Sequence, residues 1–314
     1  MAMKITLASS LVSSLLPFGI LLSILLIYNI SFVKNENPAQ PSFRAIRNGF
    51  QDILNADPEE GKKEGATESK IQQQDNCILN RKFMPNGSMP LILLLSIPGS
   101  GNTWVRYLLE RASGIYTGSI YHGVGTGDDD NAIFRASEVC SKTTLVVKAH
   151  SPNVKQCDID GAIMLVRNPY GAILAEFNRQ ISDKTSNAPI SAFKSEAWKN
   201  FTIRASSRWS KQIGTHLKII PHRMILYYEH LVQDTNFELH RMLEFLKVTP
   251  DENRIRCLLE NATGSFKRKH RNGDFNPYSS EMNVTIDSEI LKLRKIMKEY
   301  GYILPPYESY MTLK

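Results

Sequence analysis

The chain has 314 residues, 42% of them hydrophobic and 22% charged, which allows one large domain with appendages or two modest domains. Its formal net charge of +7 fits an anionic nucleotide, an acidic glycan or a nucleic acid as ligand, and is also common in secretory proteins. The four cysteines match no zinc-ribbon spacing and are too few to act as a disulfide scaffold, so small metal-stapled and disulfide-stapled domains are excluded.

The first segment of the chain is apolar. No charged residue lies between Lys4 and Lys34, and a membrane-spanning helix needs about 20 apolar residues. The run is longer than the core of a cleaved signal peptide, which has about 7–15 apolar residues. We therefore expect residues 1–34 to form a short tip and one transmembrane signal anchor, with the rest of the chain in a lumen. The polar residues 35–76 predict a stem or linker.

Residues 77–314 are expected to form the folded domain, because short apolar runs here alternate with helical periodicity. Strands are predicted at 91–97, 145–148, 162–166 and 224–228, and helices at 102–113, 170–181, 192–217, 235–245 and 288–300. Buried strands that alternate with helices predict a P-loop-like α/β fold, in which a parallel sheet has helices on both faces. The whole chain is therefore expected to consist of this α/β domain preceded by one N-terminal transmembrane helix.

The most informative segment lies between the first strand and the first helix and reads PGSGNTW. Gly99 and Gly101 allow a tight turn and a close approach of the backbone to a ligand. The N-terminus of the next helix directs its N–H groups at the turn, and Ser100, Asn102 and Thr103 add side-chain donors. The loop predicts a phosphate site, with a simple helix cap as the alternative. It is neither a Walker A loop nor a GxGxxG loop.

This segment resembles the 5′-phosphosulfate loop of the sulfotransferases that use 3′-phosphoadenosine-5′-phosphosulfate (PAPS), which reads roughly PKSGTTW. Ser100, Gly101, Thr103 and Trp104 match that pattern as they stand. The resemblance implies that Trp104 lies against the adenine ring, for which an aromatic face is suited. The chain departs from the family at Gly99, where the family has a lysine that stabilises the bridging oxygen of the leaving group.

The second strand leads into the sequence KAHSP, at the place where the cytosolic branch of the family has Lys-Thr-His. The resemblance implies that His150 is the base that takes the acceptor proton, and a near-neutral pKa suits this role. Lys148 is implied as a cation near the sulfuryl group, which could compensate for Gly99. A structural histidine is the alternative for His150, and His122 is a reserve base.

Three further segments resemble the family in the same order. Arg167, after the third strand, is implied to bind the 3′-phosphate, although the serine expected eight residues later is Ala175. Tyr228 after the fourth strand is implied to lie near the adenine. Arg268 and Lys269, in a segment that resembles the family's basic lid, are implied to complete the phosphate clamp.

The loop most resembles the sulfotransferase-like (sialate O-sulfotransferase) proteins that carry WSC domains, which are Golgi type II membrane proteins. No cysteine-rich WSC module fits in this chain, so only the transferase part is matched. The resemblance implies a Golgi enzyme that transfers a sulfuryl group from PAPS to a hydroxyl of a glycan, sialic acid being one candidate. It implies no metal and no nucleic-acid partner, and the acidic run Asp128-Asp129-Asp130 is interpreted as an exposed loop.

Two other functions stay open. Gly99 and Ala175 are what a sulfotransferase-like binding protein without turnover would show. A P-loop nucleotide kinase would need Mg²⁺ and a Walker lysine, which the loop does not have. The acceptor loops are expected at 114–142 and 182–198, and their sequence indicates neither the acceptor nor the oligomeric state.

The cysteines and the N-glycosylation sequons bear on the compartment. Cys140 and Cys157 flank the second predicted strand and are the favoured disulfide pair, with four separate thiols as the alternative. Sequons in the presumed lumenal part occur at Asn86, Asn200, Asn261 and Asn283.

Overall fold

The computed structural model describes residues 80–121, 134–135, 138–154, 157–182, 186–266 and 275–307. All of them belong to one compact unit, Glu60–Lys314. The predicted anchor and stem, His122, the acidic run 128–130 and the pair Arg268 and Lys269 lie outside the described residues. None of the described helices is both long and apolar enough to span a membrane. The anchor and the domain boundaries therefore stay predictions.

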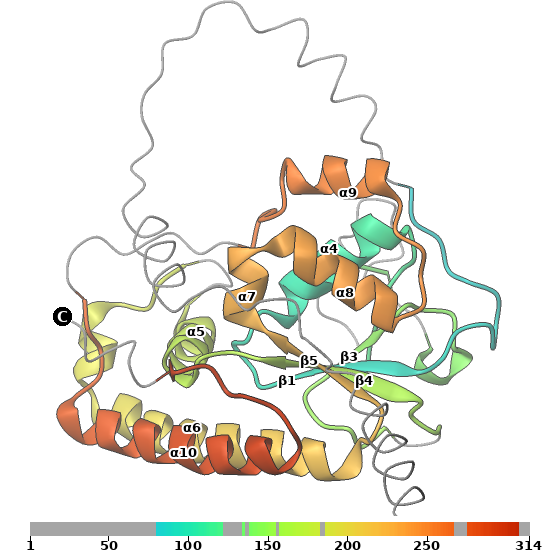
Figure 1. Cartoon of the computed structure of the whole chain (residues 1–314). Coiled ribbons are helices and arrows are strands. Elements are labelled where there is room, and N and C mark those ends of the chain that lie inside the picture. Colours follow the sequence, from blue (N-terminus) through green and yellow to red (C-terminus); the bar gives the residue numbers. More distant parts are fainter. Residues whose placement is uncertain are drawn as a thin grey trace, which may run out of the picture. The chain divides into compact units, whose positions relative to one another are not determined.

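The described core is a sheet of five parallel strands in the order β2-β3-β1-β4-β5 (Figure 1). β1 (Ile92–Ser96) is central, with β3 (Val147–Ala149) on one side and β4 (Gly161–Val166) on the other. β2 (Gly118–Ser119) and β5 (Arg223–Tyr227) are the outer strands. The predicted parallel sheet is confirmed, and the chain changes direction across the sheet at β1, where such folds bind ligands.

Helices cover both faces of the sheet, as predicted (Figure 1). The helices are α4 (Asn102–Ser113), α5 (Pro169–Ile181), α6 (Glu196–Ile219), α7 (Tyr228–Gln233), α8 (Thr235–Phe245), α9 (Glu252–Leu259) and α10 (Ser280–Glu299). Leu93 and Leu95 of β1 pack into a core cluster with residues of α5, α6 and α10, whereas Ile92 and Leu94 pack into a second cluster with residues of α4, α8 and α9. This alternation follows from the two-residue period of a strand.

The observed bounds differ from the predicted ones at particular caps. The helix predicted from residue 192 begins at Glu196, because Ser195 caps its N-terminus and Ile190–Lys194 forms a separate 3₁₀ helix, η2. The last helix begins at Ser280 rather than at residue 288, because Ser279 accepts a hydrogen bond from the N–H of Met282. The short elements β2, α7 and α9, and the 3₁₀ helix η1 (Val139–Ser141), were not predicted.

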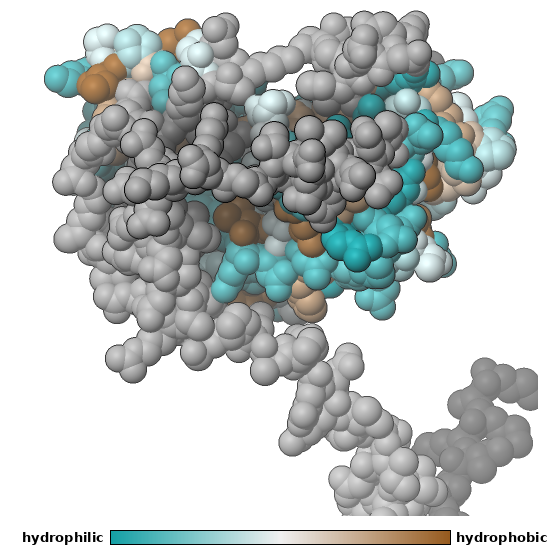
Figure 2. All heavy atoms as spheres, turned by 90° about the horizontal axis from the view of Figure 1, so that it is seen from above, coloured by the Kyte–Doolittle hydropathy of each residue, from teal (hydrophilic) through white to brown (hydrophobic). Residues whose placement is uncertain are grey.

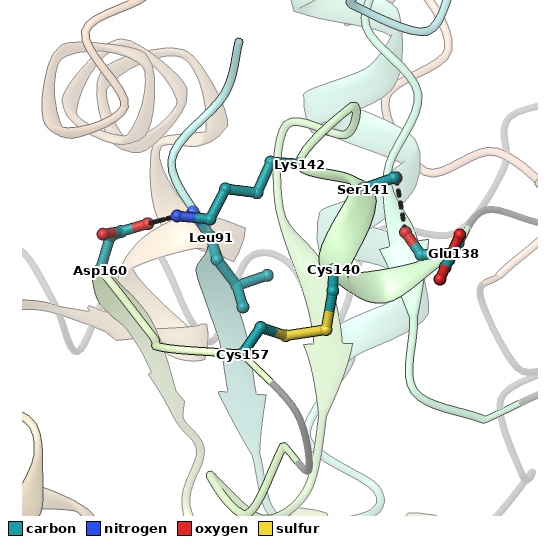
Figure 3. Close-up of a disulfide and its surroundings, with 7 residues drawn as sticks. All are labelled: Leu91, Glu138, Cys140, Ser141, Lys142, Cys157 and Asp160. Carbon is teal, nitrogen blue, oxygen red and sulfur yellow. Dashed lines mark hydrogen bonds and ion pairs between the residues drawn. A yellow bond between two sulfur atoms is a disulfide. The ribbon is translucent and has the colours of Figure 1, made fainter. Parts of the chain in front are cut away.

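A disulfide ties together the segments on either side of β3 (Figure 3). It joins Cys140 to Cys157, whose Cα atoms are 5.7 Å apart, so the favoured pairing is confirmed. Lys142 and Asp160 form a 2.9 Å ion pair across the same two segments. Cys257 is disulfide-bonded as well. None of the three cysteines in the described ranges is a free thiol, so the alternative of separate thiols is wrong.

The surface of the described part is mainly hydrophilic where it can be seen. Figure 2 views the molecule from above Figure 1 and shows hydrophobic residues only in small separate groups among hydrophilic ones. Most large apolar side chains lie instead in the two clusters against the sheet, although some, such as Val284 and Ile303, are exposed. This is the distribution expected of a folded domain with its own core.

Candidate functional site

Four segments that the sequence singles out meet at one edge of the sheet. Parallel register pairs Leu95 with Ala149, Ser96 with Leu165, and Val166 with Tyr227. The residues that follow these strand ends are the glycine loop, His150, Arg167 and Tyr228. The carboxyl edge of a parallel sheet therefore brings together side chains that are up to 132 positions apart, from Ser96 to Tyr228.

The glycine loop needs both of its glycines. Gly99 has φ 84° and Gly101 has φ 95°, a left-handed region that disfavours other residues. A Cβ on residue 101 would lie 2.9 Å from the Tyr228 ring, and one on residue 99 would overlap the carbonyl oxygen of Ala172. Gly99 therefore sits directly against α5, and the position has no room for the family's lysine.

Polar side chains in this loop have different tasks. The Asn102 amide donates to the Leu94 carbonyl at 2.9 Å and to Ser96 Oγ at 3.0 Å, so it fastens the loop to β1. The predicted contact of Asn102 with a ligand stays a prediction. Ser100 Oγ is buried and has no hydrogen-bond partner in the described part of the chain. A buried hydroxyl of this kind is satisfied when a ligand accepts its proton. Thr103 lies in the first turn of α4.

Trp104 and Tyr228 form an aromatic pair beside the loop. Their ring centroids are 5.8 Å apart in an edge-to-face arrangement. Trp104 Nε1 donates to the Ala262 carbonyl at 2.7 Å, and the neighbouring Tyr107 hydroxyl donates to the Asn261 carbonyl at 3.1 Å. The turn after α9 therefore fixes the Trp104 ring. The two half-buried rings form an aromatic surface at the loop, and the adenine contact expected for them stays a prediction.

Arg167 points at the loop. Its Nη1 donates to the Gly99 carbonyl at 2.8 Å, and its guanidinium lies 4.1 Å from the centre of the Tyr228 ring. Asn168 caps α5 by accepting from the N–H of Tyr170. The Trp209 indole donates to the Arg167 carbonyl at 3.0 Å, which fixes this turn from α6. Arg167 therefore has a rigid backbone and a cationic head beside the loop.

Glu229 and Tyr307 support the Arg167 turn, and neither was predicted as a site residue. Glu229 accepts from the Asn168 N–H at 2.9 Å and from the Tyr307 hydroxyl at 3.0 Å. Burial raises the pKa of Glu229, against the opposing effects of the Asn168 N–H and the Arg167 charge. Burial also raises the pKa of Tyr307 well above its ordinary value. The contact ties the C-terminal part of the described chain to the site across 78 positions, a separation at which no sequence signal could have indicated it.

His150 is held from three sides. Its ring Nδ1 lies 2.7 Å from the Ser96 carbonyl oxygen. Its backbone N–H donates to the Tyr121 hydroxyl at 3.0 Å, and its backbone carbonyl accepts from the Gln212 side-chain amide. Burial lowers the pKa of His150, the bond to Ser96 opposes this, and the charge of Lys148 lowers the pKa further. The structure therefore places Lys148, on β3, close to a histidine that stays neutral near pH 7.

Two charged residues of α5 also act on the pKa of His150, and neither was predicted as a site residue. Glu176 is buried and binds Arg179 through two bonds, of 2.7 Å from Nε and 2.5 Å from Nη2. Glu176 acts to raise the pKa of His150 and Arg179 to lower it. The three-residue spacing suggests a helix-surface ion pair, but only the packing of α5 against the loop shows that Glu176 lies next to Gly99.

A pocket of about 310 Å³ lies between the segment that follows His150 and helix α6. His216 of α6 lines it and is 3% exposed, and its ring has no hydrogen-bond partner among the described residues. Arg208 and Lys211 give the pocket positive charge. The other lining residues are Ser151, Pro152, Gln212 and Thr215. The described residues contain no group of three His, Cys, Asp or Glu side chains placed to hold a metal.

Comparison with known proteins identifies the relatives of the chain. No family model matches it. A WSCD family member of Drosophila melanogaster is 36% identical over 69% of this chain and 67% of its own length. The chain belongs to the WSCD family. WSCD family members of Drosophila pseudoobscura pseudoobscura and Aedes aegypti are 37% and 34% identical, and each match covers 63% of this chain and 63% of the relative.

Solved structures also align with this WSCD-family chain. A mouse sulfotransferase complexed with PAP aligns at TM-score 0.41 and 16% identity, over 74% of this chain and 94% of that one. A sulfotransferase from Alicyclobacillus acidocaldarius aligns at TM-score 0.41 and 13% identity, over 67% of this chain and 96% of that one.

Proposed function

We propose that this WSCD-family protein is a sulfotransferase, which transfers a sulfuryl group from PAPS to a hydroxyl group of a carbohydrate. The observation that carries the proposal is the meeting, at one sheet edge, of the segments that resemble the PAPS site. Ser100 Oγ is buried there without a partner, and Arg167 lies beside the same loop. The membership of the WSCD family supports the proposal.

The residues present fit PAPS by their chemistry. The N–H groups at the start of α4 and the Ser100 hydroxyl suit the 5′-phosphosulfate, because a helix N-terminus attracts anions. The Arg167 guanidinium suits the 3′-phosphate, together with Arg268 and Lys269, which lie outside the described residues. The edge-to-face pair of Trp104 and Tyr228 suits the adenine.

His150 would act as the general base. Because its Nδ1 donates to Ser96, its Nε2 carries the lone pair that can accept the proton of an acceptor hydroxyl. When bound, PAPS supplies a sulfuryl group whose bond to the 5′-phosphate breaks as the new oxygen–sulfur bond forms, and the electron pair stays on that phosphate. The loop N–H groups and Lys148 would stabilise the negative charge that develops there.

The acceptor is proposed to be an acidic sugar, of which sialic acid is an example. The pocket between the segment that follows His150 and α6 carries Arg208 and Lys211, and none of its lining residues is acidic. Two cations in this pocket favour an acceptor that carries a carboxylate. A panel of acidic and neutral glycans, with release of adenosine 3′,5′-bisphosphate as the readout, tests this. Equal rates on the neutral members would contradict it.

The proposed location is the Golgi lumen, with a single-pass type II anchor in residues 1–34. The Cys140–Cys157 disulfide supports an oxidising compartment. Asn86, in an exposed turn, and Asn261, in the exposed turn after α9, are accessible sequons. Glycosidase treatment of the protein from a eukaryotic host is expected to increase its gel mobility. Unchanged mobility would count against the lumenal orientation.

A binding protein without turnover is the second candidate, and the specific observation in its favour is Gly99. A loop lysine is impossible at this position because α5 fills the space. Such a protein would bind the nucleotide and release no product.

Calorimetry with adenosine 3′,5′-bisphosphate on the full-length chain, without added metal, tests the proposed function. We expect micromolar binding, weakened at least about tenfold by Arg167→Ala, because a charge-assisted bidentate contact is lost. Ser100→Ala should weaken binding less. Arg204→Ala, at an exposed position of α6, is the matched control and should bind normally. If the wild-type chain does not bind, the sulfotransferase proposal is wrong.

A further inference from the structure

The glycine loop leaves the proposed reaction without its usual cation. A Cβ at position 99 would overlap the Ala172 carbonyl oxygen and lie 3.0 Å from the Glu176 backbone nitrogen. Helix α5 therefore occupies the volume that a loop side chain would need. Sulfuryl transfer builds negative charge on the leaving phosphate oxygen, so a cation at this place is expected to matter. If the protein catalyses sulfuryl transfer, a different structural element has to supply this cation.

Helix α5 carries a cation immediately beyond that contact. Arg179 follows Glu176 by one turn, and Glu176 binds its Nε and Nη2 at 2.7 and 2.5 Å. The Glu176 side chain is 10% exposed and that of Arg179 is 56% exposed. A nearly buried carboxylate therefore holds a guanidinium that solvent and ligands can reach. Nη1 of Arg179 makes no hydrogen bond to any described residue, which leaves donors available.

The pair also acts electrostatically on the proposed base. Glu176 raises and Arg179 lowers the pKa of His150. The bonds to Glu176 raise the pKa of Arg179, so the guanidinium is always protonated. Burial alone would raise the pKa of Glu176, but the bonds from Arg179 and Gln180 outweigh it and keep the carboxylate ionised.

We propose that Arg179, positioned by Glu176, is the cation that contacts the sulfuryl group and its leaving oxygen in place of the missing loop lysine. The inference rests on the proposed sulfotransferase function. Arg179 would be a catalytic residue, and Glu176 a positioning residue. The bidentate ion pair aims the guanidinium fork from a rigid helix.

Two other cations are near, and each has a different place. Arg167 directs Nη1 to the Gly99 carbonyl and lies over Tyr228, so it faces the nucleotide side of the loop. Lys148 is on β3, which ends at Ala149 directly before His150, so its charge comes from the sheet and not from α5. Arg179 therefore adds a cation from the α5 side that neither of these supplies.

The test compares PAPS with adenosine 3′,5′-bisphosphate, which lacks the sulfuryl group, on the full-length chain. For Arg179→Ala we expect calorimetry to show an unchanged affinity for the bisphosphate and an affinity for PAPS about tenfold lower. Release of the bisphosphate from PAPS should fall by about 10²–10³, the usual effect of removing one donor that stabilises developing charge. Arg204→Ala, also an exposed helix arginine, is the control and should match wild type.

Chemical rescue and two further variants separate catalysis from folding. Added guanidinium should restore part of the Arg179→Ala turnover, which loss of a structural contact would not allow. Arg179→Lys should retain partial activity, and Glu176→Gln should lower the turnover while binding of the bisphosphate persists. Gly99→Lys should not restore activity to Arg179→Ala, because position 99 has no room for a side chain.

The outcomes are distinguishable. A wild-type chain that binds neither nucleotide would overturn the proposed function together with this inference. A wild-type chain that binds both, with Arg179→Ala equal to it in PAPS affinity and turnover, would overturn the inference alone. Restoration of activity by Gly99→Lys would also overturn it.

Discussion

His150 Nδ1 lies 2.7 Å from the carbonyl oxygen of Ser96, the last residue of β1. A carbonyl can only accept, so the neutral ring carries its proton on Nδ1 and has its lone pair on Nε2. The end of β1 thus fixes the tautomer of His150, which follows β3. The ring orientation is set by the sheet before any ligand arrives.

This relationship predicts the pH dependence of turnover. Burial lowers the pKa of His150 from its ordinary value of 6.5, and a general base works only when neutral. Activity should therefore be constant around pH 7 and fall in acid, with a midpoint below 6.5. The pH profile of kcat/KM on PAPS measures it, and a midpoint above that value would show that another group is the base. His150→Gln should remove most of the turnover, and the remaining activity should no longer fall in acid with this midpoint.

The loop glycines make a second prediction. Gly101→Ala places a Cβ 2.9 Å from the Tyr228 ring in a left-handed backbone, whereas at Gly87, φ 74°, nothing lies within 4 Å. Each alanine should lose about 1–2 kcal/mol of stability from the backbone conformation. Only Gly101→Ala should also displace Tyr228 and weaken binding of adenosine 3′,5′-bisphosphate. Thermal unfolding and calorimetry on both variants separate the two effects, and equal nucleotide affinities would contradict the proposed adenine contact.

The disulfide beside β3 makes a third prediction. Cys140 and Cys157 are 17 positions apart, and closing such a loop stabilises the folded state by about 3 kcal/mol. Changing both to serine should lower the free energy of unfolding by about that amount, measured by urea denaturation. Lys142→Ala removes the partly exposed ion pair across the same segments and should cost at most about 1 kcal/mol. A larger loss from Lys142→Ala than from the cysteine pair would refute this assignment.

His216 predicts how stability depends on pH. Burial lowers the pKa of this histidine from 6.5 to about 4, so the unfolded chain binds the proton more readily than the folded one. The contribution of neutral His216 to the free energy of unfolding is therefore complete above pH 6.5. It disappears progressively as the pH falls towards 4, a loss of about 3 kcal/mol. His216→Gln should make the free energy of unfolding less dependent on pH in this interval. Parallel slopes for variant and wild type would show that other groups cause the acid effect.

Sequence reasoning succeeded where the information is local. The predicted helix 102–113 was right at both ends, because Gly101 and Gly114 flank it in the left-handed conformation. It missed the start of α10 because the Ser279 cap, and not the apolar period alone, sets the first turn. It did not show that the Asn102 amide bonds to the Leu94 carbonyl, since nothing in the loop sequence indicates that this side chain turns inward.

By itself the sequence determined the parallel α/β order and the strand ends that carry Ser100, His150 and Arg167. Both follow from hydrophobic period and turn residues, which act over a few positions. Only the tertiary structure decided that Gly99 touches α5, that the charges of Glu176 and Arg179 act on His150, and that Tyr307 reaches Glu229. These contacts join residues far apart in the chain, and they depend on how each helix packs against the sheet, which no local pattern specifies.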